Sequence, residues 1–263
     1  MDEQSPAGSE AERLDRLGVL RLRAPNPGPL TLSGTNSWLV GRDPTWVIDP
    51  GPAIAEHIEA LLAAIARRGG LGGIAITHEH SDHVGALEAL RVNCPAPLAA
   101  ARPTADVQLR DGARLGPLEA VYTPGHSGDH YAFVVEGVCF TGDAVLGEGS
   151  VFIAPDPGAL AGYLSALERL RTRELDVLCP GHGSAIWDAR ERLSHYIEHR
   201  RDRERRLLAA LNDGGRTTTD LLDAAWSEVP EQLRSAAAIT LQAHLDKLSE
   251  EGLLPSDVER SDG

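Results

Sequence analysis

The sequence predicts an α/β fold, because short strand-like runs alternate with segments of helical spacing along most of the chain. Glycine and proline are frequent, with 27 and 17 of the 263 residues, as expected where many tight turns join short elements. Each strand-like run is apolar and is bounded by Gly, Pro or Asp. These runs cover residues 37–40, 46–49, 73–77, 119–123, 131–135, 138–141 and 176–179.

Two segments, 54–65 and 160–170, place apolar residues at the spacing of an amphipathic helix. The runs 131–135 and 138–141 are separated by only two residues, Glu136 and Gly137, which predicts a hairpin. Part of the sheet is therefore expected to be antiparallel.

Helical patterns replace the strand-like runs near residue 190. Residues 195–215 predict a long charged helix that stops at a pair of glycines, and residues 217–226 start another helix with threonines before an acid. Residues 231–254 predict two further helical turns. The chain is therefore expected to consist of a disordered tail at 1–17, an α/β domain at 18–190 and a helical C-terminal domain at 191–263.

The charged side chains of these helices are expected to face solvent. Five arginines lie between residues 200 and 206, interleaved with Asp202 and Glu204, which predicts a solvated helix with salt bridges along it. Four histidines of helical segments are also expected at the surface: His57, His195, His199 and His244. As an alternative, His195 or His199 could approach the cleft if their helix packs over it.

The composition limits the partners and the compartment. The formal net charge is -14, with 39 acidic against 25 basic residues, so the protein repels nucleic acid and anionic membranes. Residues 200–263 hold nine bases against thirteen acids, whereas a DNA-reading winged helix is normally basic. The N-terminal residues lack a secretory signal, and no apolar run approaches the ~20 residues that cross a bilayer. We expect a cytoplasmic protein with no membrane partner; no oligomeric state is predicted.

The three cysteines, Cys94, Cys139 and Cys179, lie far apart in the sequence. Two of them lie within apolar strand-like runs, where a small buried thiol is the expected role. The pattern does not indicate a disulfide framework, which agrees with a reducing compartment.

The segment THEHSDHVGAL, at 77–87, contains the spacing HxHxDH at the end of a strand-like run. Histidine nitrogen and carboxylate oxygen are ligands that zinc accepts readily. Residues two apart in an extended loop point to the same side, so His78 and His80 can bind one ion. Asp82 and His83, at the start of the following helix, can face a second ion.

Three more strand-like runs end in a glycine-containing loop with a potential ligand. They lead to His126 in the sequence PGH, to Asp143 in GD and to His182 in PGHG. Glycine allows backbone angles that aim a neighbouring side chain sharply, and strands supply the rigid support that a metal site needs. A single histidine is more often structural, but this recurrence indicates a shared metal centre of seven side chains.

With these motifs, residues 18–190 resemble the metallo-β-lactamase-fold hydrolases. The segment NPGPLTLSGTNSWLV at 26–40, the segment TPGHSGDH and the helical C-terminal region are similar to the β-lactamase-like protein 2 group, with glyoxalase II-like relatives. The resemblance implies an αββα four-layer sandwich followed by a winged-helix-like C-terminal domain. It also implies two metal ions, with His78, His80 and His126 on one, Asp82, His83 and His182 on the other, and Asp143 bridging them.

The resemblance further implies a hydrolase that uses a metal-bridging hydroxide on two Zn²⁺ ions, with iron or manganese as alternatives. Asp82 is expected to have a catalytic role beside its role as a ligand, by orienting the nucleophile or taking its proton. A small-molecule acyl ester or thioester is the expected substrate, because the acidic exterior tolerates small molecules better than polyanions.

A single-stranded RNA endonuclease is the main alternative, with RNA as a substrate rather than a stable partner. A noncatalytic metal-binding scaffold ranks lower, since the full ligand set is present. A true β-lactamase also ranks lower, because those enzymes lack a bridging carboxylate at the position of Asp143. Near the site, His130 is expected either to support the ligands or to be structural, and Asn36 is expected to bind loop backbone rather than the metals.

Overall fold

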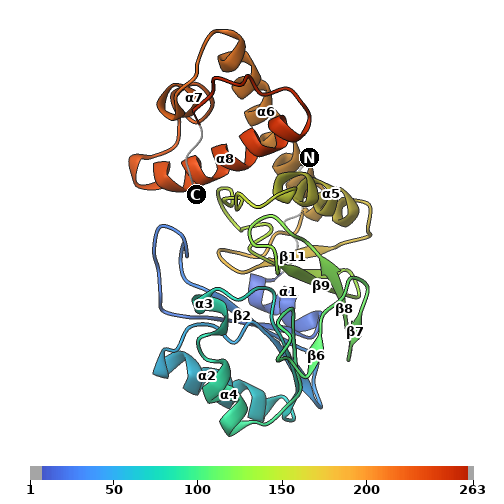
Figure 1. Cartoon of the computed structure of the whole chain (residues 1–263). Coiled ribbons are helices and arrows are strands. Elements are labelled where there is room, and N and C mark those ends of the chain that lie inside the picture. Colours follow the sequence, from blue (N-terminus) through green and yellow to red (C-terminus); the bar gives the residue numbers. More distant parts are fainter. Residues whose placement is uncertain (1–7, 260–263) are drawn as a thin grey trace, which may run out of the picture.

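The computed structural model describes residues 8–259 and contains two β-sheets packed face to face (Figure 1). The first sheet has the order β1-β2-β3-β4-β5-β6 and the second has the order β11-β10-β9-β8-β7. Strands of the first sheet are β1 (Val19–Arg23), β2 (Asn36–Val40), β3 (Thr45–Ile48), β4 (Leu71–Ala75), β5 (Leu98–Ala100) and β6 (Val107–Gln108). Strands of the second sheet are β7 (Arg114–Leu115), β8 (Leu118–Tyr122), β9 (Tyr131–Val135), β10 (Val138–Gly142) and β11 (Val177–Pro180).

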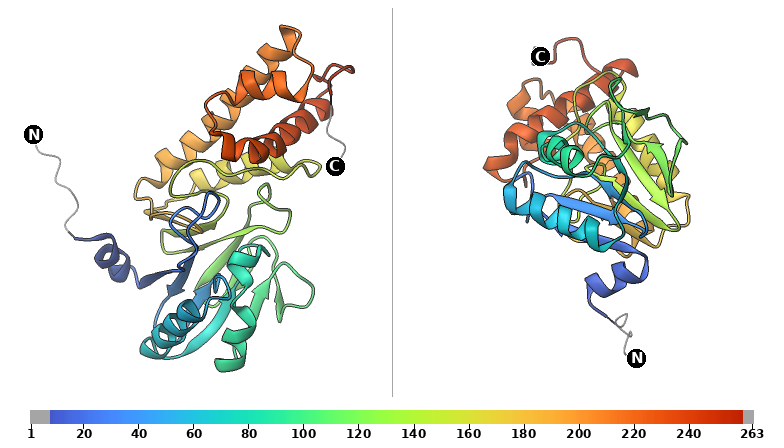
Figure 2. Two further views of the ribbon diagram at one scale, coloured as in Figure 1. Left: turned by 90° about the vertical axis from the view of Figure 1, so that its left-hand side faces the viewer. Right: turned by 90° about the horizontal axis from the view of Figure 1, so that it is seen from below.

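Helices cover the outer face of each sheet (Figures 1 and 2). Helices α2 and α4 pack on the first sheet, and α5 and the first half of α6 pack on the second. The resulting order of layers is the αββα sandwich. The helices of this part of the chain are α1 (Glu10–Arg16), α2 (Ala55–Arg67), α3 (Ser81–Val84), α4 (Leu87–Asn93), α5 (Ala159–Arg171) and α6 (Ala189–Asn212).

The alternation of side chains along each strand accounts for these layers. In β2, Trp38 faces the core between the sheets, whereas Leu39 faces the core under α2 and α4. In β10, Phe140 faces the core between the sheets and Cys139 faces α5. Central strands are therefore apolar on both faces, which is why the sequence shows continuous apolar runs rather than alternation.

The regular elements of the C-terminal domain are all helices in its described residues, and the domain has a core of its own. Leu207 and Leu211 from the second half of α6 meet Leu221, Trp226 and Leu241. Its remaining helices are α7 (Thr218–Ala225), the 3₁₀ helix η1 (Glu231–Leu233) and α8 (Arg234–Glu250). The expected two turns within 231–254 are instead one 17-residue helix, α8.

The prediction of a disordered tail at 1–17 is wrong for residues 9–17, which form a capped helix. Residues 1–7 lie outside the described residues. Ser9 and Glu12 form a capping box that starts α1, and Leu14 is buried in the core between the sheets. The Glu10 carboxylate accepts the backbone N–H of Ala185, and the Arg13 guanidinium lies over the ring of Trp187. Local capping and long-range contacts thus compensate for the polar composition of this segment.

Two predictions of solvent exposure are also wrong. His57 and His244 are buried rather than at the helix surface. Among the five arginines of α6, Arg200 and Arg203 are buried, whereas the other three, Arg201, Arg205 and Arg206, pair with nearby acids as expected. A helix that packs against two cores buries one side of a charged pattern that looks uniform in the sequence.

The predictions for the cysteines and for membrane spans can also be checked. Cys94, Cys139 and Cys179 are free thiols, and the latter two are buried as expected. Between residues 8 and 259, no helix combines the length and the apolar character that crossing a bilayer requires.

Replacing Leu14 by Ala tests whether α1 belongs to the folded core. Leu14 is 2% exposed, so the substitution should lower the free energy of unfolding by about 2–4 kcal/mol, as for other buried leucines. Leu17, at 39% exposed, offers the matched control, and Leu17→Ala should change it by less than about 0.5 kcal/mol. Urea unfolding measures both; equal values for the two variants would contradict the docked α1.

Candidate metal centre

The seven predicted ligands lie at one edge of the sandwich, because the strands that carry them end there. β8 and β10 are both antiparallel to β9, and β10 and β11 are parallel, so the loops after β8, β10 and β11 emerge at the same edge. These loops carry His126, Asp143 and His182. The loop and short helix after β4 bring the remaining four: His78, His80, Asp82 and His83.

The first group consists of three imidazoles, His78, His80 and His126. The Nδ1 atom of His80 lies 3.0 Å from the Nε2 atom of His78 and 3.0 Å from the Nε2 atom of His126. Three ring nitrogens this close can share one ion, since zinc–nitrogen bonds are about 2.0–2.1 Å long. His80 is the exposed member of the group, and the other two are buried.

The second group consists of Asp82, His83 and His182. The Oδ2 atom of Asp82 lies 3.5 Å from the Nε2 atom of His83 and 3.3 Å from the Nε2 atom of His182. This arrangement can hold another ion, with two nitrogen ligands and one oxygen ligand.

Asp143 lies between the two groups. Its Oδ1 atom is 3.5 Å from His83 Nε2, and its Oδ2 atom is 3.3 Å from His182 Nε2 and 3.6 Å from His126 Nε2. Gly181 allows this approach, because a Cβ atom there would lie 2.4 Å from Asp143 Oδ1. A carboxylate that touches ligands of both groups has the position of a bridge between two ions.

Two buried polar atoms without a hydrogen bond show that these residues fit a metal centre. His83 Nε2 and Asp143 Oδ1 lie 3.5 Å apart, and neither has a hydrogen-bond partner among the described residues. A buried polar atom without a partner costs about 1–3 kcal/mol, and more when it is charged. A divalent cation would satisfy both atoms at once, so the donor set matches the ions that the sequence implies.

Asp49, which no motif of the sequence indicates as a site residue, orients the histidines from behind. Its Oδ2 atom lies 2.8 Å from Nδ1 of His83 and accepts a hydrogen bond from Oγ1 of Thr77, and its Oδ1 atom accepts the Thr77 backbone N–H. Thr77 Oγ1 in turn lies 3.0 Å from Nδ1 of His78. With Nδ1 as the donor in both rings, each Nε2 lone pair points into the site.

Three further residues support the remaining ligands. Nε2 of His130 accepts the backbone N–H of Asp143, which favours the supporting role over a purely structural one. Thr35 Oγ1 donates to Asp82 Oδ2 over 2.9 Å. The Asn36 side chain donates to the carbonyls of Pro180 and Gly183 on either side of His182, so it binds loop backbone as expected.

The electrostatics separate the histidines into neutral and charged rings. Burial lowers the pKa of His126 to about 4, and burial together with neighbouring imidazoles holds the pKa of His78 well below its usual range. Burial also opposes a charge on His83, but the carboxylates of Asp143 and Asp49 raise its pKa to about 9. A cation between Asp82 and Asp143 would replace the proton on this ring, since ligand histidines bind metals in the neutral form.

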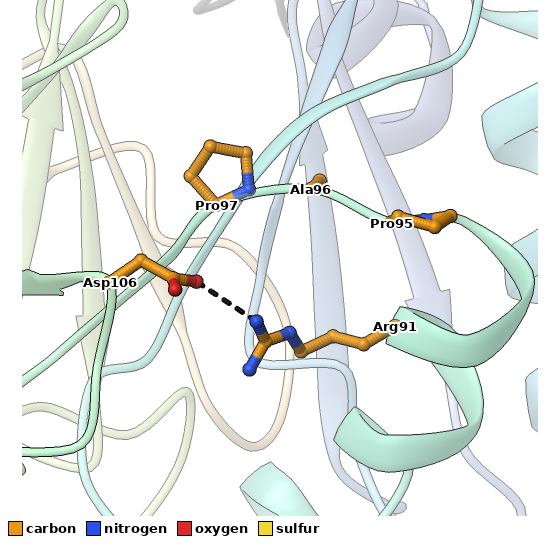
Figure 3. Close-up of a pocket in the computed structure, with 5 residues that line it drawn as sticks. All are labelled: Arg91, Pro95, Ala96, Pro97 and Asp106. Atoms are coloured by element: carbon orange, nitrogen blue, oxygen red, sulfur yellow. Dashed lines mark hydrogen bonds and ion pairs between the residues drawn. The ribbon is translucent and has the colours of Figure 1, made fainter.

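A separate surface pocket lies away from these residues, at the C-terminal end of α4. It has a volume of ≈ 450 Å³ and contains an ion pair of 3.0 Å between Arg91 and Asp106 (Figure 3). None of the seven candidate ligands lines it. The pocket is therefore not part of the candidate metal centre.

Comparison with protein families agrees with the fold. The sequence of the metallo-beta-lactamase superfamily domain matches residues 30–118 and 106–182 of this chain. The sequence of the beta-lactamase associated winged helix domain matches residues 217–259. The chain belongs to the metallo-beta-lactamase superfamily.

Individual relatives extend this assignment over most of the chain. The beta-lactamase-like protein 2 homolog of Caenorhabditis elegans is 30% identical over 95% of this chain and 90% of its own length. A metallo-beta-lactamase family protein from Thermus thermophilus has a TM-score of 0.74 and 26% identity, covering 89% of this chain and 94% of that structure. Another solved structure, in a di-iron-bound form, has a TM-score of 0.54 and 28% identity, covering 65% of this chain and 96% of that structure.

The family, the fold and the cluster of imidazoles and carboxylates define a metal-dependent hydrolase with a divalent metal centre. The resemblance to this superfamily and to the β-lactamase-like protein 2 group is confirmed. The αββα sandwich with a helical C-terminal domain of the winged-helix type is confirmed as well.

The substitution Asp49→Asn tests the support behind His83. The amide cannot accept from both Thr77 and His83 as the carboxylate does, so affinity for divalent metal should fall about 10–100-fold. Competition with a chromophoric chelator measures this affinity. Asp15→Asn, at an exposed aspartate of α1 that pairs with Arg42, serves as the control. Unchanged affinity in the Asp49 variant would contradict its supporting role.

Proposed function

We propose that this protein is a dinuclear metal hydrolase of acyl esters or thioesters of small molecules, with the seven residues named above as its ligands. The observation that carries the proposal is the position of Asp143 between two groups that can each hold an ion. His78, His80 and His126 would hold the first ion; Asp82, His83 and His182 would hold the second. Zinc is the proposed metal; the di-iron relative supports iron as an alternative, and manganese is a further one.

Two bound divalent ions would lower the pKa of water towards neutrality and polarise the substrate's carbonyl oxygen. Of the two carboxylates, Asp82 is better placed to accept a proton from the nucleophilic water, because its side chain is more exposed. The Asp82 side chain is 26% exposed, whereas that of Asp143 is 9% exposed. The hydrogen bond from Thr35 holds Oδ2 of Asp82, which leaves its other oxygen to orient the nucleophile or accept its proton.

The surroundings of the site support a small acyl substrate. The ring of Phe152 is half-buried and lies 4.5 Å, centroid to centroid, from the ring of His126, so it offers an apolar surface directly beside the ligands. The net charge of -14 disfavours extended polyanions. We also propose a cytoplasmic location and a catalytic domain at residues 18–190, with residues 191–263 as the C-terminal domain.

Single-stranded RNA is the second candidate substrate. The same Phe152 ring is partly exposed, so a base could stack on it, and aromatic stacking is a common mode of single-strand recognition. The acid excess of the C-terminal domain weighs against RNA, so it ranks second.

A substrate panel distinguishes these functions. Metal-loaded protein should hydrolyse members of a set of acyl thioesters and esters and leave labelled single-stranded RNA intact. Asp82→Ala should lower the rate at least about 100-fold, because a positioned acid or base contributes that much to proton transfer. Asp106→Ala, at the exposed pair with Arg91, is the control. Cleavage of RNA alone would reverse the order of the two functions.

Removal of the metals tests the centre itself. Dialysis against a chelator should abolish hydrolysis, and two equivalents of the correct ion per chain should restore it. Separate additions of Zn²⁺, Fe²⁺ and Mn²⁺, followed by elemental analysis, identify the metal that the site selects. Full activity in metal-free protein would exclude the proposed mechanism.

A further inference from the structure

The C-terminal domain contacts one short segment of the catalytic domain that also contacts a candidate ligand. This segment, residues 151–154, is named here the bridging segment; it lies between β10 and α5 (Figure 1). Val151 and Ile153 are buried in the core that α5 and α6 share with the second sheet. Its backbone is bound from two sides.

On one side, the bridging segment binds the loop that carries His126. Nδ1 of His126 lies 3.4 Å from the carbonyl oxygen of Phe152, and the Phe152 ring packs on the imidazole. The backbone N–H of Ala154 donates to the carbonyl of Gly125 over 2.8 Å. As an acceptor for Nδ1–H, the Phe152 carbonyl fixes the tautomer of His126 that leaves Nε2 facing His80 and Asp143.

On the other side, the bridging segment binds two helices of the C-terminal region. The Arg200 guanidinium of α6 donates to the carbonyl of Val151. The Thr240 hydroxyl of α8 accepts the backbone N–H of Ile153 over 3.1 Å and donates to the carbonyl of Ala236 within its own helix. Both side chains belong to residues that are 2% exposed, so neither contact competes with bulk water.

We propose that the C-terminal domain positions the metal ligand His126, with Arg200 and Thr240 as positioning residues that act through the bridging segment. Successive residues of the bridging segment bind the two sides in turn. Residues 151 and 153 bind the C-terminal helices through a carbonyl and an N–H group, and residues 152 and 154 bind the His126 loop in the same way. A shift of α8 therefore moves the Phe152 carbonyl and with it the direction of the Nε2 lone pair of His126. This inference rests on the proposed dinuclear centre and assigns the C-terminal domain a role in it.

The geometry predicts an effect on one ion only. His126 belongs to the group with His78 and His80, whereas Asp82, His83 and His182 are supported by Thr35, Asp49 and Asn36. Loss of the Thr240 hydroxyl should therefore weaken the binding of the first ion and leave the second unchanged. A residue that served only general packing would not distinguish between the two groups.

The pair Thr240→Ala and Thr240→Ser isolates the hydroxyl, because both variants lose the methyl group and only the serine keeps the oxygen. Metal-free protein of each variant is titrated with Zn²⁺ against a chromophoric chelator, and with Co²⁺ while the visible absorption is recorded. Thr240→Ala should weaken one of the two binding steps about tenfold, with a changed Co²⁺ spectrum for that step, and Thr240→Ser should match the wild type. Thr35→Val removes the hydrogen bond to Asp82 and leaves the first group untouched, so it should weaken the other step and identify the ion that each step reports.

The outcomes separate this inference from the proposed function. Two ions in the wild type and equal titrations for the alanine and serine variants would overturn the positioning role alone. Fewer than two ions in the wild type would overturn the dinuclear centre. If Thr240→Ala does not fold, Arg200→Met compared with Arg200→Lys makes the same test at the Val151 carbonyl, where only the lysine can still donate.

Discussion

The burial of the Asp143 carboxylate is the constraint on which the rest of this site depends. A carboxylate taken out of water costs several kcal/mol unless opposite charge and hydrogen bonds compensate for it. The protein supplies the ring nitrogens of His83, His126 and His182 around it, and His130 binds its backbone N–H. The lack of a side chain at Gly181 is a further consequence, because any Cβ atom would collide with this oxygen.

The clustering of the seven candidate residues was predictable from the sequence because each follows an apolar strand-like run, and strands that end at one edge bring their loops together. Asp49 has the same pattern at the end of β3, but its side chain contacts Thr77 and His83 from behind, and only these contacts make its role evident. The strands β5, β6 and β7 have only two or three residues each, too few to show a period. The capping box at Ser9 and Glu12 was a readable signal for α1 that the acidic composition masked.

In the charged helix α6, the sequence does not predict which arginines become buried. Arg200 and Arg203 resemble their neighbours Arg201 and Arg205 in type and spacing, yet the first two are buried and bind backbone carbonyls. Which side of a uniformly charged helix becomes buried depends on partners distant in the sequence, here the segment after β10 and the end of α7. The acid excess of the C-terminal domain is consistent with this inward role, since its basic side chains serve contacts within the chain rather than a polyanion.

The continuity of α6 limits how this molecule can move. Its 24 residues extend about 36 Å, with Leu193 and Tyr196 in the core of the α/β domain and Leu207 and Leu211 in the core of the C-terminal domain. A helix rather than a flexible linker joins the two units, so they cannot swing apart as tethered modules do. Any rotation of one core relative to the other must therefore bend or unwind this helix.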